Sequence, residues 1–354
     1  MRRHHPDAAA PFQLIVLVVL TLAVPFVIRV AIARQAEAPA IPSYLPALEG
    51  PRTREPFNPE PIEELRRMNP GYVVIGDSMA GSRIDPRRLT ELARQPIAPL
   101  LQAGSGPAYW YLLLKNWVIA SGIHPRVVFI FFRDTNLTNV MYRLDDQYRW
   151  MLDVAALERE DGLNHAIATR TEGPWRRIEQ GVERAYGADQ ARRLLEPALA
   201  GWVGRTVIPS RRQRTAFMTN MNARFGLDHL RPMDAADIAA AEDRDADFNR
   251  YVDRSVLPLM LRDAKAAGLR LCFVRVQRRP AGGRPPYQSP ALRRYTRDLR
   301  RYLELHGAIF RDDTGDAALT LDMYEDGDHL AASARRRYTE VLFERLRPLF
   351  EGQP

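Results

Sequence analysis

The chain has little cysteine and little lysine. Cys272 is the only cysteine among 354 residues, which excludes a disulfide framework and a metal site built on several thiolates. Lys115 and Lys265 are the only lysines, so the formal charge of +8 comes from arginines that are interspersed with acidic residues. No basic block interleaved with aromatic residues occurs, which argues against nucleic acid as a partner. Positive charge of this kind favours an anionic surface or polymer.

Charge is absent from the 18-residue run between Pro11 and Ile28. A helix of that length spans about 27 Å, close to the thickness of the hydrocarbon core of a bilayer. Two arginines precede the run and favour a cytoplasmic N-terminus. We therefore expect residues 1–34 to be a single-pass anchor in the cytoplasmic (inner) membrane, with the bulk of the chain extracytoplasmic, in the periplasm. The alternative is a cleaved signal peptide, because residues 31–33 read Ala-Ile-Ala.

Proline is frequent between residues 35 and 62, which predicts a spacer. After the spacer, apolar runs rich in β-branched residues alternate with amphipathic stretches at helical spacing. The predicted strands lie at 71–78, 97–106, 125–134, 269–277 and 308–313, and the predicted helices at 63–68, 85–95, 108–122, 246–267, 289–307 and 331–346. This alternation predicts an α/β fold in which helices cover both faces of a parallel sheet.

The alternation of strands and helices stops between residues 141 and 243. This segment lacks strand-like runs and is rich in Arg, Glu, Ala and Asp at helical spacing, which predicts a mostly helical insertion. The strand-forming segments stand on both sides of it. Residues 63–140 and 244–354 are therefore predicted to form one catalytic-type domain.

Two short segments carry residue types that suit nucleophilic catalysis. Ser78 ends a Gly-Asp-Ser motif (76–78) directly after the first predicted strand, and Asp326 and His329 stand in a turn before the last helix. A serine hydroxyl needs a base within hydrogen-bond reach, and the base needs a third group that fixes its tautomer. We therefore expect Ser78 as the nucleophile, His329 as the base and Asp326 as the orienting carboxylate, with Asp328 as the alternative orienting group.

These two motifs, in this order and about 250 residues apart, resemble the SGNH or GDSL-type hydrolase superfamily. The resemblance covers residues 70–140 and 255–348. It implies a three-layer, flavodoxin-like α/β fold and a serine esterase or O-acyltransferase that uses no cofactor. It also implies that a glycine amide of the second family motif contributes to an oxyanion hole, and here that glycine is Gly106 or Gly104.

The third family motif, Gly-x-Asn-Asp after a strand, is altered in this chain. The segment after the predicted strand reads Arg133-Asp134-Thr135-Asn136. The side-chain donor to the oxyanion is therefore expected from Arg133 or from Asn136. A donor of this kind contributes roughly 3 kcal/mol to the stability of the transition state, so the alteration bears directly on the rate.

The order of anchor, spacer and SGNH-like domain resembles proteins that modify envelope polysaccharides. Among them are the periplasmic alginate O-acetylation proteins and the lipoteichoic-acid D-alanylation protein. The resemblance implies transfer or removal of an O-acyl group on an acylated envelope glycan, and the acyl group expected is acetyl. It further implies a membrane-bound O-acyltransferase as a partner.

Three other interpretations address the same motifs. An SGNH-like domain without activity would serve as a glycan-binding or scaffold protein of an acylation complex, and the altered third motif favours this. A nucleophile elbow of the α/β-hydrolase type is the second, but that elbow normally follows several strands rather than the first. A metal centre is the third and is not expected, because Asp134, Asp326 and Asp328 have no accompanying His or Cys ligands.

Overall fold

The computed structural model of the chain describes residues 56–144, 148–171, 246–280, 286–325 and 328–351, with isolated positions before residue 49. The chain divides into two compact units. One comprises Ile41–Arg170 with Pro232–Pro354, and the other comprises Met1–Ala40 with Thr171–Arg231. The architecture below is that of the first unit, which contains most of the described residues.

The predicted anchor at 1–34 and the part of the predicted insertion from 172 to 243 lie almost wholly outside the described residues. In the ranges that the structure does describe, no helix is long and apolar enough to cross a membrane.

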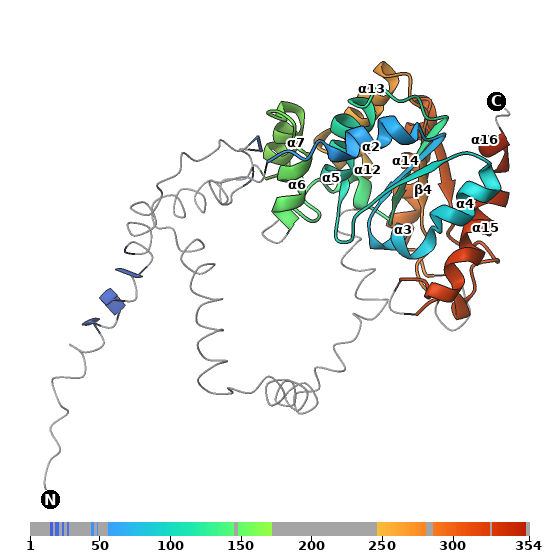
Figure 1. Cartoon of the computed structure of the whole chain (residues 1–354). Coiled ribbons are helices and arrows are strands. Elements are labelled where there is room, and N and C mark those ends of the chain that lie inside the picture. The colour runs from blue at the N-terminus through green and yellow to red at the C-terminus, as the bar shows by residue number, and fades with distance from the viewer. Residues whose placement is uncertain are drawn as a thin grey trace, which may run out of the picture. The chain divides into compact units, whose positions relative to one another are not determined.

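A five-stranded parallel sheet forms the centre of this unit (Figure 1). Its strands are β1 (Tyr72–Gly76), β2 (Ile97–Leu101), β3 (Val127–Phe132), β4 (Leu271–Arg275) and β5 (Ile309–Asp312), in the order β2-β1-β3-β4-β5. Each strand falls within a segment predicted as a strand, and the expected α/β class is confirmed. The chain leaves β1 for β2 on one side and returns to β3 on the other, so the carboxyl ends of β1 and β3 flank a switch point where ligands bind in such sheets.

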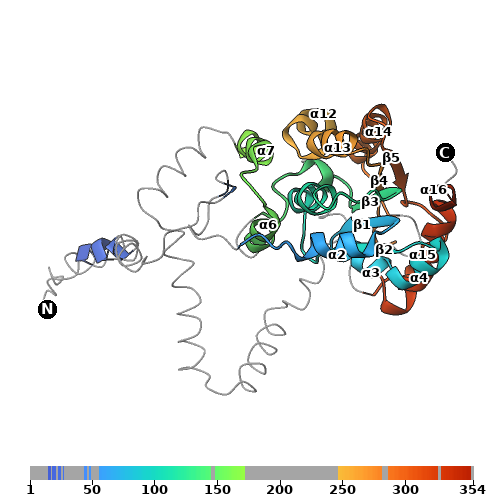
Figure 2. The same ribbon diagram turned by 45° about the horizontal axis from the view of Figure 1, so that its top comes forward.

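The alternation of side chains along the strands produces two hydrophobic cores. Val73 and Ile75 of β1 face one core, and Tyr72 and Val74 face the other. The first core is covered by α2 (Glu60–Met68), α5 (Pro107–Leu112), α6 (Arg149–Ala155), α7 (Asp161–Thr171), α12 (Phe248–Tyr251), α13 (Leu257–Ala266) and α14 (Pro290–Leu305). The second core is covered by α3 (Ser78–Arg83), α4 (Pro86–Ala93), α15 (Arg335–Arg345) and α16 (Arg347–Glu351). Figure 2 shows α12, α13 and α14 on one side of the strands and α3, α4 and α15 on the other.

Capping residues mark the start of α4 and the end of α13. Asp85 accepts a hydrogen bond from the Arg88 N–H at 3.1 Å, with Pro86 in the first helical turn. Gly268 follows α13 with a φ of +68°, a left-handed conformation that glycine adopts at little cost.

Two predicted helices differ from their expected form. Within 108–122, α5 continues into a π-helical segment, η1 (Leu113–Ile119). Within 246–267, α12 is followed by a short 3₁₀ turn and then by α13. The Ser255 hydroxyl accepts a hydrogen bond from the Leu257 N–H at 3.2 Å, and Pro258 stands in the first turn of α13. A new helix therefore starts here, although the apolar pattern runs on unchanged.

Helices α6 and α7 both fall within the predicted insertion. Their apolar residues Met151, Leu152, Leu163 and Ile167 are buried in the same core as one face of the sheet. The first part of the segment predicted as an insertion therefore belongs to the same core as the sheet, with α6 packed on α5 and η1.

Candidate functional site

Ser78 is the first residue of α3, directly beyond the end of strand β1. Asp77 precedes it in an extended conformation, and its carboxylate accepts a hydrogen bond from the Met79 N–H at 2.9 Å. A Cβ on Gly76 would lie 2.6 Å from the Cβ of Ala80, so only glycine lets the helix start this close to the strand. The turn thus presents the serine at the carboxyl edge of the sheet.

His329 lies next to this serine. Its Nε2 atom is 2.9 Å from Ser78 Oγ, although 251 positions separate the two residues along the chain. A β-bridge between Tyr324 and Leu330 closes the loop that carries the histidine, and the Leu330 N–H donates to the Ser82 hydroxyl of α3 at 3.2 Å. The histidine loop is therefore attached to the serine helix at more than one point.

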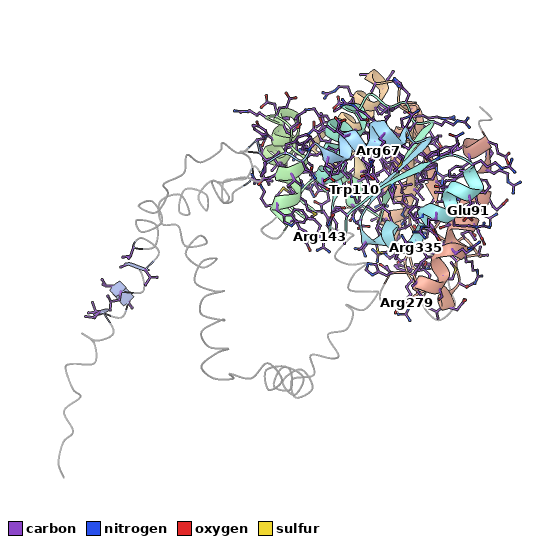
Figure 3. The ribbon with its side chains drawn as sticks, viewed as in Figure 1. Arg67, Glu91, Trp110, Arg143, Arg279 and Arg335 are labelled. Carbon is purple, nitrogen blue, oxygen red and sulfur yellow. The ribbon has the colours of Figure 1, made fainter. Side chains whose placement is uncertain are left out.

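Of the two acidic residues before His329, the structure describes only Asp328. Asp326 lies outside the described residues. Asp328 directs its carboxylate away to other partners, since it accepts hydrogen bonds from Arg133 Nη1 and from the Arg279 N–H, both at 2.9 Å. Arg279 is on the exposed surface and is labelled in Figure 3. These contacts disfavour Asp328 as the group that orients the histidine.

The turn after β2 reaches the same edge of the sheet. The Gln102 N–H donates to the Gly76 carbonyl at 3.0 Å, and the Ser105 hydroxyl donates to the same carbonyl at 3.3 Å. Ser105 in turn accepts a hydrogen bond from Trp110 Nε1 at 2.8 Å, and Trp110 is labelled in Figure 3. Both predicted glycines, Gly104 and Gly106, are in this turn.

Close packing explains why both positions are glycine. A Cβ on Gly106 would lie 2.3 Å from the backbone oxygen of Tyr142, and a Cβ on Gly104 would lie 2.5 Å from the ring of Tyr148. Gly104 also has a φ of +75°, whereas Gly106 is extended. In the described part of the chain, neither the Ser78 N–H nor the Gly106 N–H donates to a protein acceptor. Neither amide is therefore used in a hydrogen bond of the described fold.

The two candidate donors from the third motif are placed differently. Arg133 follows β3 and forms the ion pair with Asp328 that adjoins the histidine. Burial disfavours its charge, but Asp328 and Asp134 outweigh this and raise the pKa of Arg133. Asn136 starts a short 3₁₀ turn, is 8% exposed, and donates its backbone N–H to the Arg133 carbonyl at 2.9 Å. The structure therefore brings Arg133, rather than Asn136, into contact with the histidine loop.

Asp77 is held in a largely buried position beside the serine. Burial raises the pKa of its carboxyl group, and the Met79 N–H and the charge of Arg133 only partly offset this. Its hydrogen bond to Met79 makes it a capping residue of α3.

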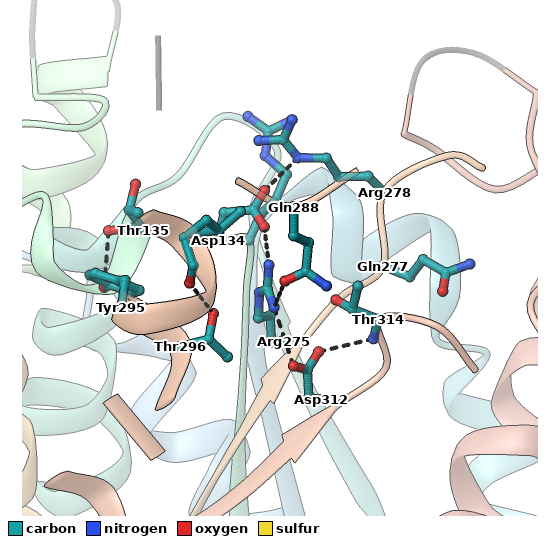
Figure 4. A network of polar contacts seen from close by, with 12 residues as sticks. Asp134, Thr135, Arg275, Gln277, Arg278, Gln288, Tyr295, Thr296, Asp312 and Thr314 are labelled. Atoms are coloured by element: carbon teal, nitrogen blue, oxygen red, sulfur yellow. Dashed lines mark hydrogen bonds and ion pairs between the residues drawn. The ribbon is translucent and has the colours of Figure 1, made fainter. Parts of the chain in front are cut away.

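A second polar network joins the carboxyl ends of β3, β4 and β5 (Figure 4). Asp134, with a φ of +44°, accepts hydrogen bonds from Arg275 Nη2 at 2.6 Å and from Arg278 Nε at 2.5 Å. Arg275 also donates to Asp312 at 3.2 Å and to Gln288 at 2.9 Å. Burial opposes ionisation of Asp134, but the two guanidinium groups outweigh it and lower the pKa of that carboxyl group. The network supports the turn that carries Arg133.

Sequence reasoning missed three arginines of this region, the buried Arg83 and Arg275 and the partly buried Arg278. Each stands at or near the end of a helix or strand, but none belongs to a recognisable motif, so the sequence offered no signal beyond an arginine beside apolar residues. Among the described residues, no group of three or more His, Cys, Asp or Glu side chains is placed to hold a metal ion.

No protein-family model matches the chain, and no curated protein matches it.

Proposed function

We propose that the chain is a serine-dependent O-acyltransferase or esterase of the SGNH type that acts on a cell-envelope polysaccharide. The 2.9 Å contact between Ser78 Oγ and His329 Nε2 carries this proposal. A serine becomes a nucleophile when a base at this distance accepts its proton. His329 takes that proton while Oγ attacks the ester carbonyl, and it then returns the proton to the departing alcohol, which leaves an acyl group on Ser78.

The fold supports the same proposal. The strand order β2-β1-β3-β4-β5 is the flavodoxin-like order, in which ligands bind at the switch point. The Ser78 and Gly106 amides would stabilise the oxyanion from there, with the Arg133 guanidinium as the side-chain donor. Asp326 would orient His329 through its other ring nitrogen.

The second step decides between the two reactions. If water attacks the acyl group on Ser78, the enzyme is an esterase, and if a sugar hydroxyl attacks it, the enzyme is a transferase. The uncharged run before residue 29 and the excess of positive charge favour an anionic polymer at the outer face of the membrane as substrate. The resemblance in the sequence favours a membrane-bound O-acyltransferase as the donor partner.

The test is turnover of p-nitrophenyl acetate by the purified protein, with and without an added oligosaccharide. Ser78→Ala and His329→Ala are each expected to remove almost all turnover, and Asp326→Asn to leave a small part of it, because the carboxylate only orients the base. Ser333→Ala, at an exposed serine after the histidine loop, serves as the matched control and should keep wild-type turnover. Acetyl groups found on the oligosaccharide would identify a transferase. Full activity of Ser78→Ala would refute the proposal.

A second candidate function is an inactive glycan-binding or scaffold protein. The observation that favours it is the ion pair of Arg133 with Asp328. Arg133 stands in the chain where the resembling family motif has its asparagine donor, and the ion pair engages its side chain. A wild-type protein that binds an acetylated oligosaccharide but turns over no ester would establish this second function.

A further inference from the structure

Arg83 is a buried arginine within the helix that starts at Ser78. It is the last residue of α3, and its side chain is 0% exposed. An arginine remains charged wherever it lies, so its burial is costly unless its donors find acceptors. An apolar side chain would fill the same space without that cost. Packing alone therefore does not explain an arginine at this buried position.

The guanidinium donates to three backbone carbonyls. Arg83 Nη1 donates to Met79 O at 3.0 Å, and Nη2 donates to Gln277 O at 2.8 Å and to Asp328 O at 3.0 Å. These acceptors come from the start of α3, from the chain after β4 and from the histidine loop. The planar fork of an arginine places these donors on two separate nitrogens in a fixed geometry, whereas a lysine carries its three N–H donors on a single nitrogen.

Two of these carbonyls adjoin the candidate catalytic residues in the chain. Met79 directly follows Ser78, and Asp328 directly precedes His329. The Arg83 guanidinium therefore links the peptide after the serine to the peptide before the histidine, without touching either reactive atom.

Two aromatic rings hold the guanidinium in place. Its central carbon lies 5.9 Å from the ring centroid of Tyr324 and 5.8 Å from that of Tyr338. Tyr324 starts the histidine loop through its bridge to Leu330, and Tyr338 belongs to α15. The rings restrict the movement of Arg83, so the distance between the two linked peptides is set by a rigid group.

We propose that Arg83 is a positioning residue that holds His329 within hydrogen-bond reach of Ser78. This inference rests on the proposed function. Its physical basis is that an error of about 1 Å in the placement of a catalytic group lowers the rate about 100-fold. Loss of the link leaves the loop attached through Ser82 and Arg133, so the fold persists while the histidine loses its fixed position.

The experiment measures how fast a fluorophosphonate probe modifies Ser78 in the full-length protein. In this reaction Ser78 Oγ forms a bond to phosphorus, fluoride leaves, and His329 accepts the hydroxyl proton, so the rate reports the placement of the base. The fraction of protein labelled at completion reports how much is folded. Arg83→Met is expected to slow labelling about 100-fold without lowering that fraction. Arg83→Lys should fall between this variant and the wild type, and kcat for p-nitrophenyl acetate should fall in both at unchanged KM.

Arg335→Met is the matched control. Arg335 Nε donates to the Ile84 carbonyl at 2.5 Å, so Arg335, like Arg83, donates to a backbone carbonyl of the α3 region. Arg335 is labelled in Figure 3. It makes no hydrogen bond to the histidine loop in the described part of the chain, so its variant should be labelled at the wild-type rate.

The outcomes separate this inference from the proposed function. A wild-type protein that is not labelled at Ser78 overturns the proposed function and this inference with it. Wild-type labelling together with equally fast labelling of Arg83→Met overturns the inference alone. A labelled fraction that falls in proportion to the rate also overturns the inference alone, since Arg83 would then only stabilise the fold. If Arg83→Met does not fold, the comparison of Arg83→Lys with Arg335→Met decides.

Discussion

At the scale of single residues, Gly106 has the least room for a side chain in the candidate site. We predict that Gly106→Ala lowers turnover of p-nitrophenyl acetate about 100-fold, because the added methyl group would displace the amide that is proposed to face the oxyanion. The new Cβ would lie only 2.3 Å from the backbone oxygen of Tyr142, which cannot move aside as a flexible side chain does, so the residue at position 106 has to shift. Steady-state kinetics of the variant measure the effect.

Gly81→Ala is the control for this prediction. Gly81 lies inside α3 and has no atom within 4 Å of an added Cβ, so alanine should raise the free energy of unfolding by roughly 0.5–1 kcal/mol and leave turnover unchanged. Wild-type turnover in Gly106→Ala would remove Gly106 from the oxyanion hole and leave Gly104 as the glycine donor.

At the scale of secondary-structure elements, Asp134 is the acidic centre of the network that joins β3 to β4. We predict that Asp134→Asn lowers the free energy of unfolding by about 3 kcal/mol at pH 7, since Arg275, which is buried, and Arg278 both lose the charge of this carboxylate. The pKa of Asp134 is lowered in the folded state, so its contribution is present above the unfolded value of about 3.9. The contribution is lost as the pH falls through the lower folded value.

Urea unfolding at pH 7 and at about pH 3 checks this expectation. The difference in the free energy of unfolding between wild type and Asp134→Asn should be smaller at the lower pH. Asp322→Asn provides the control, because Asp322 also pairs with an arginine, Arg337 at 3.3 Å, but lies on the exposed surface. Its unfolding midpoint should match the wild type at pH 7. If Asp134→Asn is destabilised relative to the wild type by the same free energy at both pH values, an ionic role for the network is contradicted.

The start of α4 depends on one side chain. Asp85→Ala is predicted to cost about 1 kcal/mol of stability, because the Arg88 N–H loses its acceptor, whereas Asp85→Asn should stay close to the wild type since an amide oxygen also caps. Chemical denaturation of the two variants makes the comparison. Equal stability of all three proteins would show that Pro86 alone is enough to start the helix.

At the scale of the whole molecule, we predict a chain anchored in the membrane with its C-terminus outside the cytoplasm. The uncharged run between Pro11 and Ile28 and the arginines before it are the basis of this prediction. Alkaline phosphatase fused after Pro354 should be active, whereas a green fluorescent protein fused there through the general secretion route should be dark. The mature chain should retain residues 1–33. A mature N-terminus near Arg34 would replace the anchor by a cleaved signal peptide and leave the compartment unchanged.

Local features of the fold could be predicted from the sequence alone. All five strands lie within the predicted segments, because buried parallel strands require continuous apolar runs that can be recognised over a few residues. The cap at Asp85 and the left-handed Gly268 were predictable for the same reason, since each depends on its immediate neighbours. The break before α13 was not predicted, because the apolar pattern continues through it; the start is defined by Pro258 and by the hydrogen bond to Ser255.

The sequence by itself determined which residue types are available for chemistry and where they stand along the chain. Only the tertiary structure decided which of them meet. Ser78 and His329 lie 2.9 Å apart because the loop that follows β5 returns to the end of β1, although β3 and β4 lie between these two strands in the sheet. Hydrophobic patterns carry no information about such a path. The choice of Arg133 over Asn136 as neighbour of the histidine loop, and the link through Arg83, depend on the same long-range packing. Their partners lie some 200 residues away, beyond the reach of any local pattern.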